Sequence, residues 1–187
     1  SVIKARNDFR FDNSTGELMR IDSSGRVLIG HTSSRTIANH ASRLQLQGTD
    51  YQTATFSIVN NANAGNGAFI FLASQRSGSV GGSTVLQNND NIGTLRFLAG
   101  DGTDINSYAA EIQVNIDGTP GSNDVPGRIT FKTTADGAAG PTERLRIDKN
   151  GKLTLANSEG IQLSAKTSSL YTSDGSLSYY AADNAVY

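Results

Sequence analysis

The chain has 187 residues, a formal net charge of −1 and no cysteine. The lack of cysteine excludes disulfide bonds and thiolate metal sites within the chain. No apolar run is long enough to span a membrane and no signal peptide is recognisable, so we expect no membrane insertion. Because the chain begins on Ser1 rather than Met and ends on the strand-like residues 184–187, we expect a fragment or a processed piece of a longer polypeptide.

The charges are unevenly distributed along the chain. Residues 1–47 carry seven Lys/Arg and four Asp/Glu, whereas residues 48–142 carry four Lys/Arg and eight Asp/Glu. The cations of the first stretch are spaced singly between apolar residues, as on the solvated face of a strand. Nucleic-acid-binding proteins usually cluster their cations. We therefore expect no nucleic-acid partner.

Residues 1–35 are predicted to form an N-terminal β-hairpin segment. Short strands are expected at residues 2–3, 9–11 and 19–21, with turn sequences between them. Residues 33–47 contain the only weak helical candidate, because a few apolar residues lie at helical spacing, but the end of this stretch alternates like a strand. Both interpretations stay open at this point.

Residues 36–142 are predicted to form a central β domain, an antiparallel β-sandwich-like unit. Short strands recur there at regular intervals, and Asp-Gly pairs, a strong hairpin signal, directly follow three of them. The expected strands are residues 55–59, 68–73, 94–98, 110–116 and 128–133.

Residues 143–187 are predicted to form a C-terminal β-hairpin segment, which begins with a repeat. Residues 17–29 recur as residues 143–155, an offset of 126 positions (143 minus 17), and Glu, Arg, Ile, Asp and Gly coincide in register. A further strand is expected at residues 161–163, and a hairpin is expected in which residues 170–172 pair with residues 177–179 across a turn at residues 173–176.

The repeated stretch has the pattern of a β-hairpin. Asp22 and Asp148 stand at the first position of a four-residue turn, where a short carboxylate accepts hydrogen bonds from main-chain N–H groups. Gly25 and Gly151 close the turn, where a positive φ costs least without a Cβ. These four residues are predicted to be structural turn residues.

A two-stranded unit of this size cannot bury its own apolar face. Its reuse in one chain therefore implies packing against further copies or against other chains. The sequence predicts an all-β fold in which hairpin repeats flank the central unit, and it predicts that the strand edges and faces are buried in an oligomer.

The sequence gives little support for a metal site. His31 and His40 are the only histidines, and two ring nitrogens are too few for zinc unless carboxylates or other subunits join them. Residues 101–106 offer several hard oxygens but lack the bidentate Glu of a calcium loop, so a plain Asp-Gly turn is favoured. We expect no metal.

Evidence for catalysis is equally thin. Glu111 is the one Glu of the central unit, and with Asp101, Asp104 and Asp117 nearby in sequence a glycosidase-like carboxylate pair is conceivable. The favoured interpretation is a solvated face of an antiparallel strand. There is no Gly-x-Ser-x-Gly elbow and no P-loop lysine. The sequence thus predicts no catalytic residue and no cofactor.

Recognition residues are sought at loop borders, where Tyr and Asn often contact ligands. Tyr51 and Tyr108 lie at such borders, and residues 87–91 form an Asn-rich loop that contains Asn88 and Asn89. These four residues are the candidate receptor contacts, that is, the residues expected to touch a binding partner.

The paired motifs at residues 20–30 and 146–151 also carry a resemblance. The chain resembles fibre and virion structural proteins of tailed bacteriophages, most closely those of marine phages that infect cyanobacteria. Segments in the same order as in such proteins are residues 93–97, 127–134, 143–148 and 170–180.

The resemblance implies an intertwined homotrimer on the surface of a virion, most simply a tail-fibre or spike segment that attaches to a host-cell receptor. Its partners would be its own copies, other virion structural proteins and a host surface glycan or protein. Many relatives carry a self-cleaving chaperone, and nothing here matches its catalytic part. The alternatives are a capsid head fibre or decoration protein and a polysaccharide depolymerase tailspike. We expect no enzymatic activity.

Overall fold

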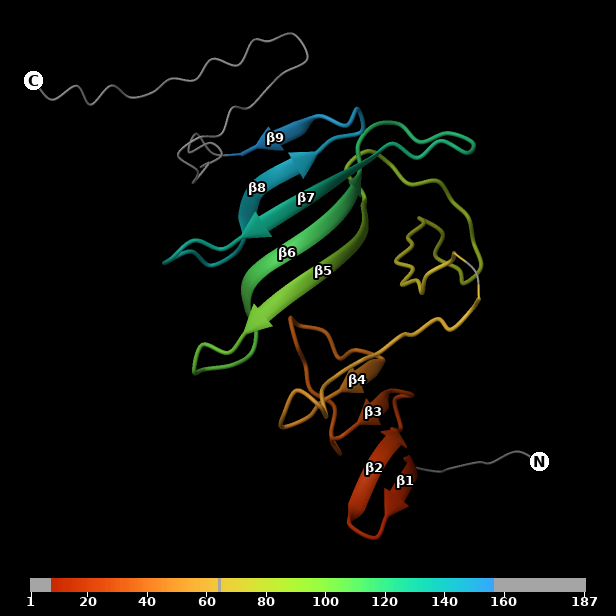
Figure 1. Cartoon of the computed structure of the whole chain (residues 1–187), viewed down its shortest axis with the longest axis vertical. Coiled ribbons are helices and arrows are strands. Elements are labelled where there is room, and N and C mark those ends of the chain that lie inside the picture. The colour runs from red at the N-terminus through yellow and green to blue at the C-terminus, as the bar shows by residue number, and fades with distance from the viewer. Residues whose placement is uncertain (1–7, 64, 157–187) are drawn as a thin grey trace, which may run out of the picture. The chain divides into compact units, whose positions relative to one another are not determined.

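The structure is a computed structural model of the whole chain, and it describes residues 8–63 and 65–156. Over these residues the chain forms nine strands in two sheets and no helix, which confirms the predicted all-β class (Figure 1). Accordingly, no helix that could cross a membrane occurs in this part of the chain. The strand expected at residues 2–3 and the strands expected after residue 156 lie outside the described residues.

The first sheet has the strand order β1-β2-β3-β4. Its strands are β1 (Phe9–Asn13), β2 (Gly16–Ile21), β3 (Val27–Ile29) and β4 (Leu44–Leu46). β1, β2 and β3 are antiparallel neighbours, whereas β4 pairs with β3 in parallel. Because a parallel neighbour cannot be reached by a tight turn, residues 30–43 form a crossover between β3 and β4. Leu28, in the middle of β3, is fully buried.

The weak helical candidate at residues 33–47 forms part of this crossover and β4. Ala38 and Asn39 have φ angles of 51° and 64°, and such left-handed conformations interrupt a right-handed helix. Gln45 is buried, and its Oε1 accepts a hydrogen bond from the main-chain N–H of Arg35 at 3.0 Å. The strand-like alternation at the end of the stretch, and not the helical spacing, therefore predicted the structure correctly.

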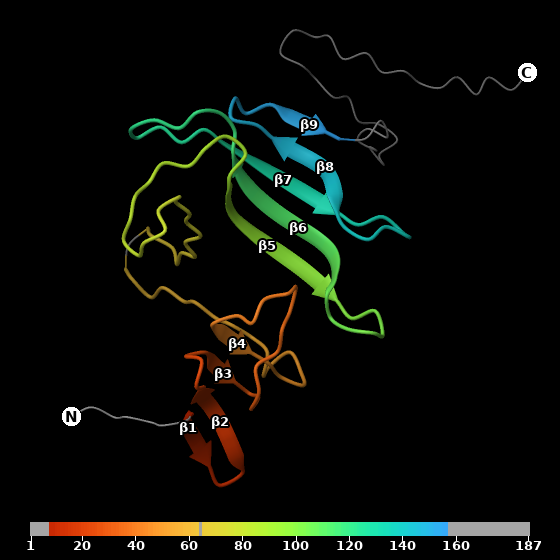
Figure 2. The ribbon, with the colours of Figure 1, turned by 180° about the vertical axis from the view of Figure 1, so that it is seen from behind.

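The second sheet is an antiparallel meander in which each strand pairs with the next one along the chain (Figure 2). Its strands are β5 (Asn91–Ala99), β6 (Ser107–Ile116), β7 (Gly127–Thr133), β8 (Thr142–Ile147) and β9 (Leu153–Leu155). The sheet is open, so β5 and β9 are its edge strands. The second copy of the repeat thus lies in the same sheet as the central strands.

The predicted Asp-Gly turns connect neighbouring strands of this sheet. After β5, Asp101 Oδ1 accepts hydrogen bonds from the main-chain N–H groups of Thr103 (2.8 Å) and Asp104 (3.1 Å). Asp117 directly follows β6, and Asp136 lies between β7 and β8. The short carboxylate at the start of each connection is typical of such turns.

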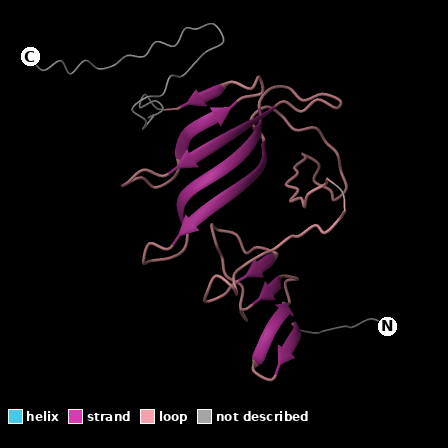
Figure 3. Cartoon of the chain, viewed as in Figure 1, coloured by secondary structure: helices cyan, strands magenta, loops and turns pink. Residues whose placement is uncertain are grey.

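Two predicted strands are wrong. Residues 55–59 and 68–73 lie in the stretch between β4 and β5, where the described residues form no strand (Figure 3). Their side chains are exposed, with Phe71 84% accessible. A strand requires a hydrogen-bonded neighbour, and no described residue forms a main-chain hydrogen bond with either stretch. The remaining central strands form one open sheet among the described residues, not a sandwich-like unit; the boundaries at 35/36 and 142/143 stay predictions.

The described part of the chain has a very small core. Leu28 and Ile116 are its only fully buried large apolar side chains. Twenty large apolar residues remain exposed, which is far more than scattered surface residues of a stable monomer. Most of the apolar surface in this part of the chain is therefore uncovered.

The first copy of the repeat is the β2–β3 hairpin. Its strands pair Met19 with Ile29, and the N–H of Gly25 donates to the C=O of Asp22 at 2.9 Å. The Asp22 carboxylate also accepts a hydrogen bond from the N–H of Ser24 at 2.9 Å. Gly25 has a φ of 73°, as the turn requires.

The second copy is the β8–β9 hairpin, and it repeats this geometry. Leu145 pairs with Leu155, and the N–H of Gly151 donates to the C=O of Asp148 at 2.9 Å. The Asp148 carboxylate accepts a hydrogen bond from the N–H of Asn150 at 2.8 Å. Gly151 has a φ of 78°. All four predicted turn residues thus occupy the expected turn positions.

We expect the Gly151→Ala variant to lower the free energy of unfolding by about 1–2 kcal/mol, because a Cβ is disfavoured at positive φ. No atom lies within 4 Å of the added Cβ, so the effect reports backbone strain alone. Gly151→Asn should cost less, since Asn tolerates this conformation. Gly140→Ala, with neither a positive φ nor a neighbour within 4 Å, is the control. Urea denaturation measures all three, and equal stability of Gly151→Ala and Gly140→Ala would contradict the assignment.

Candidate functional site

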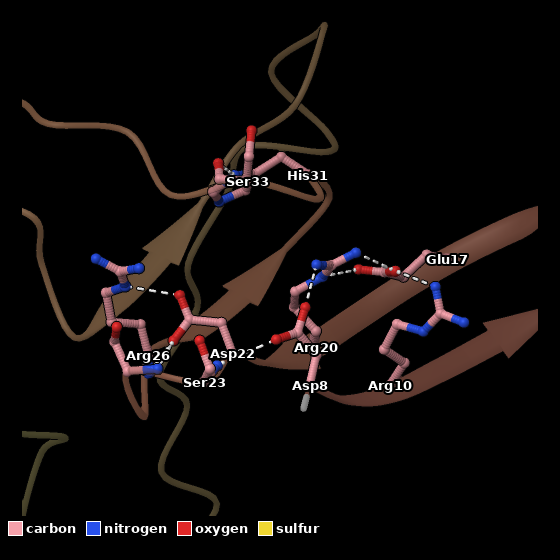
Figure 4. Close-up of polar contacts among 10 residues, drawn as sticks. Asp8, Arg10, Glu17, Arg20, Asp22, Ser23, Arg26, His31 and Ser33 are labelled. Atoms are coloured by element: carbon pink, nitrogen blue, oxygen red, sulfur yellow. Dashed lines mark hydrogen bonds and ion pairs between the residues drawn. The ribbon is translucent and has the colours of Figure 1, made fainter. Parts of the chain in front are cut away.

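A β-bulge places an acidic and a basic residue on one face of β2. Residues three apart in a regular strand lie on opposite faces. The register shifts between β1 and β2, so that Leu18 is the extra residue. As a result Glu17 and Arg20 lie side by side, with Arg20 Nη2 donating to Glu17 Oε2 at 2.6 Å (Figure 4). Arg10 approaches the same carboxylate at 3.6 Å.

The same bulge recurs in β8. The register between β7 and β8 skips Arg144, the residue equivalent to Leu18. Glu143 and Arg146 then lie on one face, and Arg146 Nη2 donates to Glu143 Oε2 at 2.7 Å. The Glu-x-x-Arg spacing of both copies is therefore explained by a bulge between the two charges.

A carboxylate from outside each hairpin binds its turn. Asp8 Oδ1 accepts a hydrogen bond from the N–H of Ser23 at 3.1 Å, and its other oxygen contacts Arg20 (Figure 4). In the second copy the N–H of Lys149, the residue equivalent to Ser23, donates to Asp117 Oδ2 at 3.1 Å. The two carboxylates come from different places in the chain, just before β1 and just after β6.

These contacts shift the pKa values of the acidic groups downward. The hydrogen bond from Arg20 lowers the pKa of Glu17, and the main-chain N–H of Arg26 lowers that of Asp22. The main-chain N–H of Lys149 lowers the pKa of Asp117 in the same way. The hydrogen bonds from Arg20, Arg26 and Lys149, all of which belong to the two hairpins, therefore favour the charged form of each carboxylate.

One face of the β5–β9 sheet is polar across its strands. Register places Arg96, Glu111, Lys132 and Glu143 in one row over β5 to β8. The neighbouring row over all five strands consists of Thr94, Gln113, Thr130, Arg146 and Thr154. Three side chains of this face, Glu111, Asn115 and Thr130, are buried.

Glu111 is the centre of the polar face. It is only 6% exposed, and its two oxygens accept hydrogen bonds from Lys132 Nζ at 2.7 Å and from Arg96 Nε at 3.1 Å. Burial raises its pKa, but the hydrogen bonds from Lys132 and Arg96 outweigh this and lower the pKa overall. The sequence-based expectation of a solvated side chain was wrong, because the two neighbouring cations enclose it. Arg96 also stacks on Tyr108, 4.6 Å from the ring centre.

The opposite face of the same sheet is apolar. One row across all five strands consists of Leu95, Ile112, Phe131, Leu145 and Leu155. The next row consists of Gly93, Val114, Ile129, Ile147 and Leu153. None of these residues is buried, and Leu95 is 52% exposed. These two rows are therefore less covered than the polar face, the reverse of an ordinary sheet, although Ile116 at the end of the apolar face is fully buried.

The predicted receptor contacts have different environments. Tyr51 is 81% exposed in the loop after β4, and Asn88 is exposed in the loop before β5. Asn89 has a structural role, because its Oδ1 accepts from Arg128 Nη2 at 2.9 Å and its N–H donates to the C=O of Ile116 at 3.0 Å.

The sheet does not bring these residues together into one site. Asn89 lies next to the first residue of β5, whereas Tyr108 pairs with Leu98 near the last residue of that strand. With a rise of about 3.3 Å per residue, the two ends of β5 are roughly 25 Å apart. Any receptor contact would use these residues separately.

The described residues contain no cluster of three or more metal-binding side chains. The oxygens of Asp101 already accept hydrogen bonds from Thr103, Asp104 and the Ser107 hydroxyl, and these bonds lower its pKa to about 2. His31 Nδ1 is within 2.8 Å of the C=O of Ser33 (Figure 4). The loop at residues 101–106 is thus a hydrogen-bonded turn.

Two solved structures are similar to this chain. One is the carboxy-terminal domain of the bacteriophage T5 L-shaped tail fibre, with a TM-score of 0.62 and 14% identity, covering 100% of this chain and 77% of that chain. The other is that domain with its intramolecular chaperone domain, with a TM-score of 0.68 and 15% identity, covering 97% of this chain and 54% of that chain. The chain has the fold of a phage tail-fibre domain. No protein-family model and no curated protein matches it.

Sequence reasoning missed parts of this arrangement. The bulges carried a usable signal, since Glu and Arg recur three residues apart in strands that otherwise alternate. Asp8 and Asp117 carried none, because they stand at unrelated distances from the two turns. The most prominent surface of the described residues is the open apolar face of the β5–β9 sheet. The tail-fibre fold does not by itself explain it.

We expect the Glu111→Gln variant to lower the free energy of unfolding by about 1–3 kcal/mol, because two cations around a buried position lose their counter-charge. Glu143→Gln is the matched control, since its partner Arg146 is 40% exposed and such pairs contribute less than about 1 kcal/mol. Urea denaturation at one fixed protein concentration compares them. An equal effect of both substitutions would contradict a central role for Glu111.

We expect acid to destabilise the fold between about pH 4 and pH 2. The hydrogen bonds from Arg76 lower the pKa of Asp90 to about 2, and Asp101 also titrates at about 2. An unfolded Asp titrates near 3.9, so these groups stabilise the fold above about pH 4 and lose that effect as pH falls through about 2. Thermal unfolding from pH 7 to pH 2 measures this. In Asp90→Asn the loss should be shallower, and an unchanged profile would contradict the role of Asp90.

Proposed function

We propose that this chain is a structural segment of a phage tail fibre that functions as a homotrimer on the virion surface. The observation that carries the proposal is the open apolar face of the β5–β9 sheet in a chain with a tail-fibre fold. Three copies is the assembly implied by the resemblance of the Arg-Ile-Asp-x-x-Gly hairpins to phage fibre proteins. The assembly would cover the surfaces that one chain leaves in water.

The size of the uncovered face supports association. Five strands spaced about 4.8 Å apart, with about 20 Å of strand length, present on the order of 500 Å². The largest apolar patch of a typical monomer is of similar size and is often functional. A core of two fully buried large apolar side chains gives the described part of the chain little independent stability.

Attachment to a host-cell surface is the second part of the proposal. The exposed Tyr51 and Asn88 are suited to contact a glycan or a protein, since Tyr and Asn are common in recognition loops. Three identical weak sites held together bind far more tightly than one. Other virion structural proteins would hold the segment on the particle.

A structural role agrees better with the described residues than a polysaccharide depolymerase does. Glu111 is enclosed by Arg96 and Lys132, and about six strand residues, roughly 20 Å, separate it from Asp117. That distance exceeds the spacing of the carboxylate pair in a glycosidase. We therefore propose a chain without enzymatic activity. A capsid head fibre or decoration protein is the alternative location.

Sedimentation equilibrium tests the assembly. Three chains of 19.7 kDa give about 59 kDa. Leu95→Asp places a charge in the apolar face and should shift the species towards 19.7 kDa, since a buried charge without a partner is strongly disfavoured. Val80→Asp, in a fully exposed loop, is the control and should leave the mass unchanged. A wild-type mass of one chain would refute the trimer.

Gold-labelled antibodies against the chain test its place on intact phage particles in electron micrographs. We expect label along the tail fibres. Label on the head would support the alternative of a head fibre or decoration protein, and no label on the particle would refute a virion component.

A further inference from the structure

Two apolar stretches of the chain have the sequence of strands but no partner. They are residues 55–59 and 68–73, which we call the apolar arm. No main-chain hydrogen bond joins the arm to any other described residue. Its large side chains are mostly exposed, among them Phe56, Phe69, Ile70 and Phe71.

The two stretches of the arm lie close to one another. Phe69 and Phe71 stack with ring centres 5.5 Å apart, as side chains two residues apart on one face of an extended segment do. Phe56 and Ile58 from the first stretch and residues 68–70 from the second line one open apolar hollow of about 240 Å³. The hollow lacks the side chains that would fill it.

The end of the arm touches the apolar face of the β5–β9 sheet. A Cβ added at Gly93 would lie 2.8 Å from Cβ of Leu72, so the side chain of Leu72 occupies the space that Gly93 leaves free. At the same end of the sheet Leu72 and Ala73 line a pocket together with the buried Ile116. Further along the face Leu95 and Leu153 are more than half exposed. The arm and the face are therefore both apolar and lie next to each other. Large apolar side chains of both nevertheless stay exposed in one chain.

The segment that directly follows the arm is fixed near the start of β5. Arg76 binds Asp90 through two hydrogen bonds of 2.5 and 2.7 Å, and Asp90 Oδ2 also accepts from the N–H of Gln87 at 2.7 Å. This ties the segment after the arm to the end of the sheet where Leu72 meets Gly93. The arm is therefore anchored at this end, while its large side chains, among them Phe56 and Phe71, stay exposed.

We propose that the apolar arm of one copy packs on the apolar face of the β5–β9 sheet of the next copy. This inference rests on the proposed oligomer. The contact is head-to-tail, so three copies related by a threefold axis close it into a ring. The face contributes on the order of 500 Å², and three phenylalanines bury about 150–250 Å² each. The two surfaces are the two sides of one interface, and together they reach the total of about 1,000 Å² that a biological interface should exceed.

Cysteine cross-linking tests the contact, and the natural chain has no cysteine to interfere. One chain carries Phe71→Cys in the arm, and a second chain with a larger affinity tag carries Leu95→Cys in the face. The two are co-expressed, purified as mixed oligomers and treated with a flexible bismaleimide. We expect a mixed covalent pair of one tagged and one untagged chain on denaturing gels. Val80→Cys in place of Phe71→Cys is the control and should give little mixed product.

The double variant Phe71→Cys/Leu95→Cys distinguishes packing of the arm on a neighbouring copy from packing of the arm on its own chain. Covalent dimers and trimers support the exchange between copies. A product that stays at the mass of one chain, in a protein that sediments as a trimer, would overturn this inference and leave the proposed function intact. A covalent pair formed by Phe71→Cys chains alone would also overturn it, because arms would then pack on arms. A protein that sediments as a monomer would overturn both proposals.

Discussion

A sheet with one apolar face needs something to exclude water from that face, and this constraint governs the whole chain. In the β5–β9 sheet three of the four buried side chains belong to the polar face, where Glu111 is held between Arg96 and Lys132, and Ile116 is the one buried side chain of the apolar face. The apolar face stays open. Such a distribution is unstable for an isolated domain, because apolar burial is the main favourable contribution to folding. The chain therefore makes physical sense as one part of a larger assembly.

The repeated hairpins supply local order where the core cannot. Each copy combines a glycine turn, a bulge that aligns Glu with Arg, and an outside carboxylate on the turn N–H. These polar contacts fix strand register, and a slip of one residue would exchange the two faces of the strand. Pairs such as Glu17–Arg20 are partly exposed and add modest stability. Their main effect is specificity of register, which an interface between copies needs.

Sequence patterns predicted the parts of the fold that depend on neighbours in the chain. Period-two alternation located β5, β6 and β7, and the Asp-Gly pairs located their connections. The same alternation failed at residues 55–59 and 68–73, because a strand also needs a hydrogen-bonded partner and the described part of the chain offers none to them. The burial of Glu111 could not be read from its own strand, since Arg96 and Lys132 come from the two adjacent strands. The apolar face, in contrast, was implied by the alternating residues once strand register was known.

The two equivalent hairpins limit how the segment between them can change. Residues 17–29 and 143–155 offer the same register, the same bulge and the same turn at both boundaries of the intervening segment. The segment between them also supplies β4 as the neighbour of β3 and β7 as the neighbour of β8, so a replacement segment must bring its own partner strand for each hairpin. Changes of length are therefore best tolerated in the loops between the strands of this segment, where the strand partners of both hairpins stay in place.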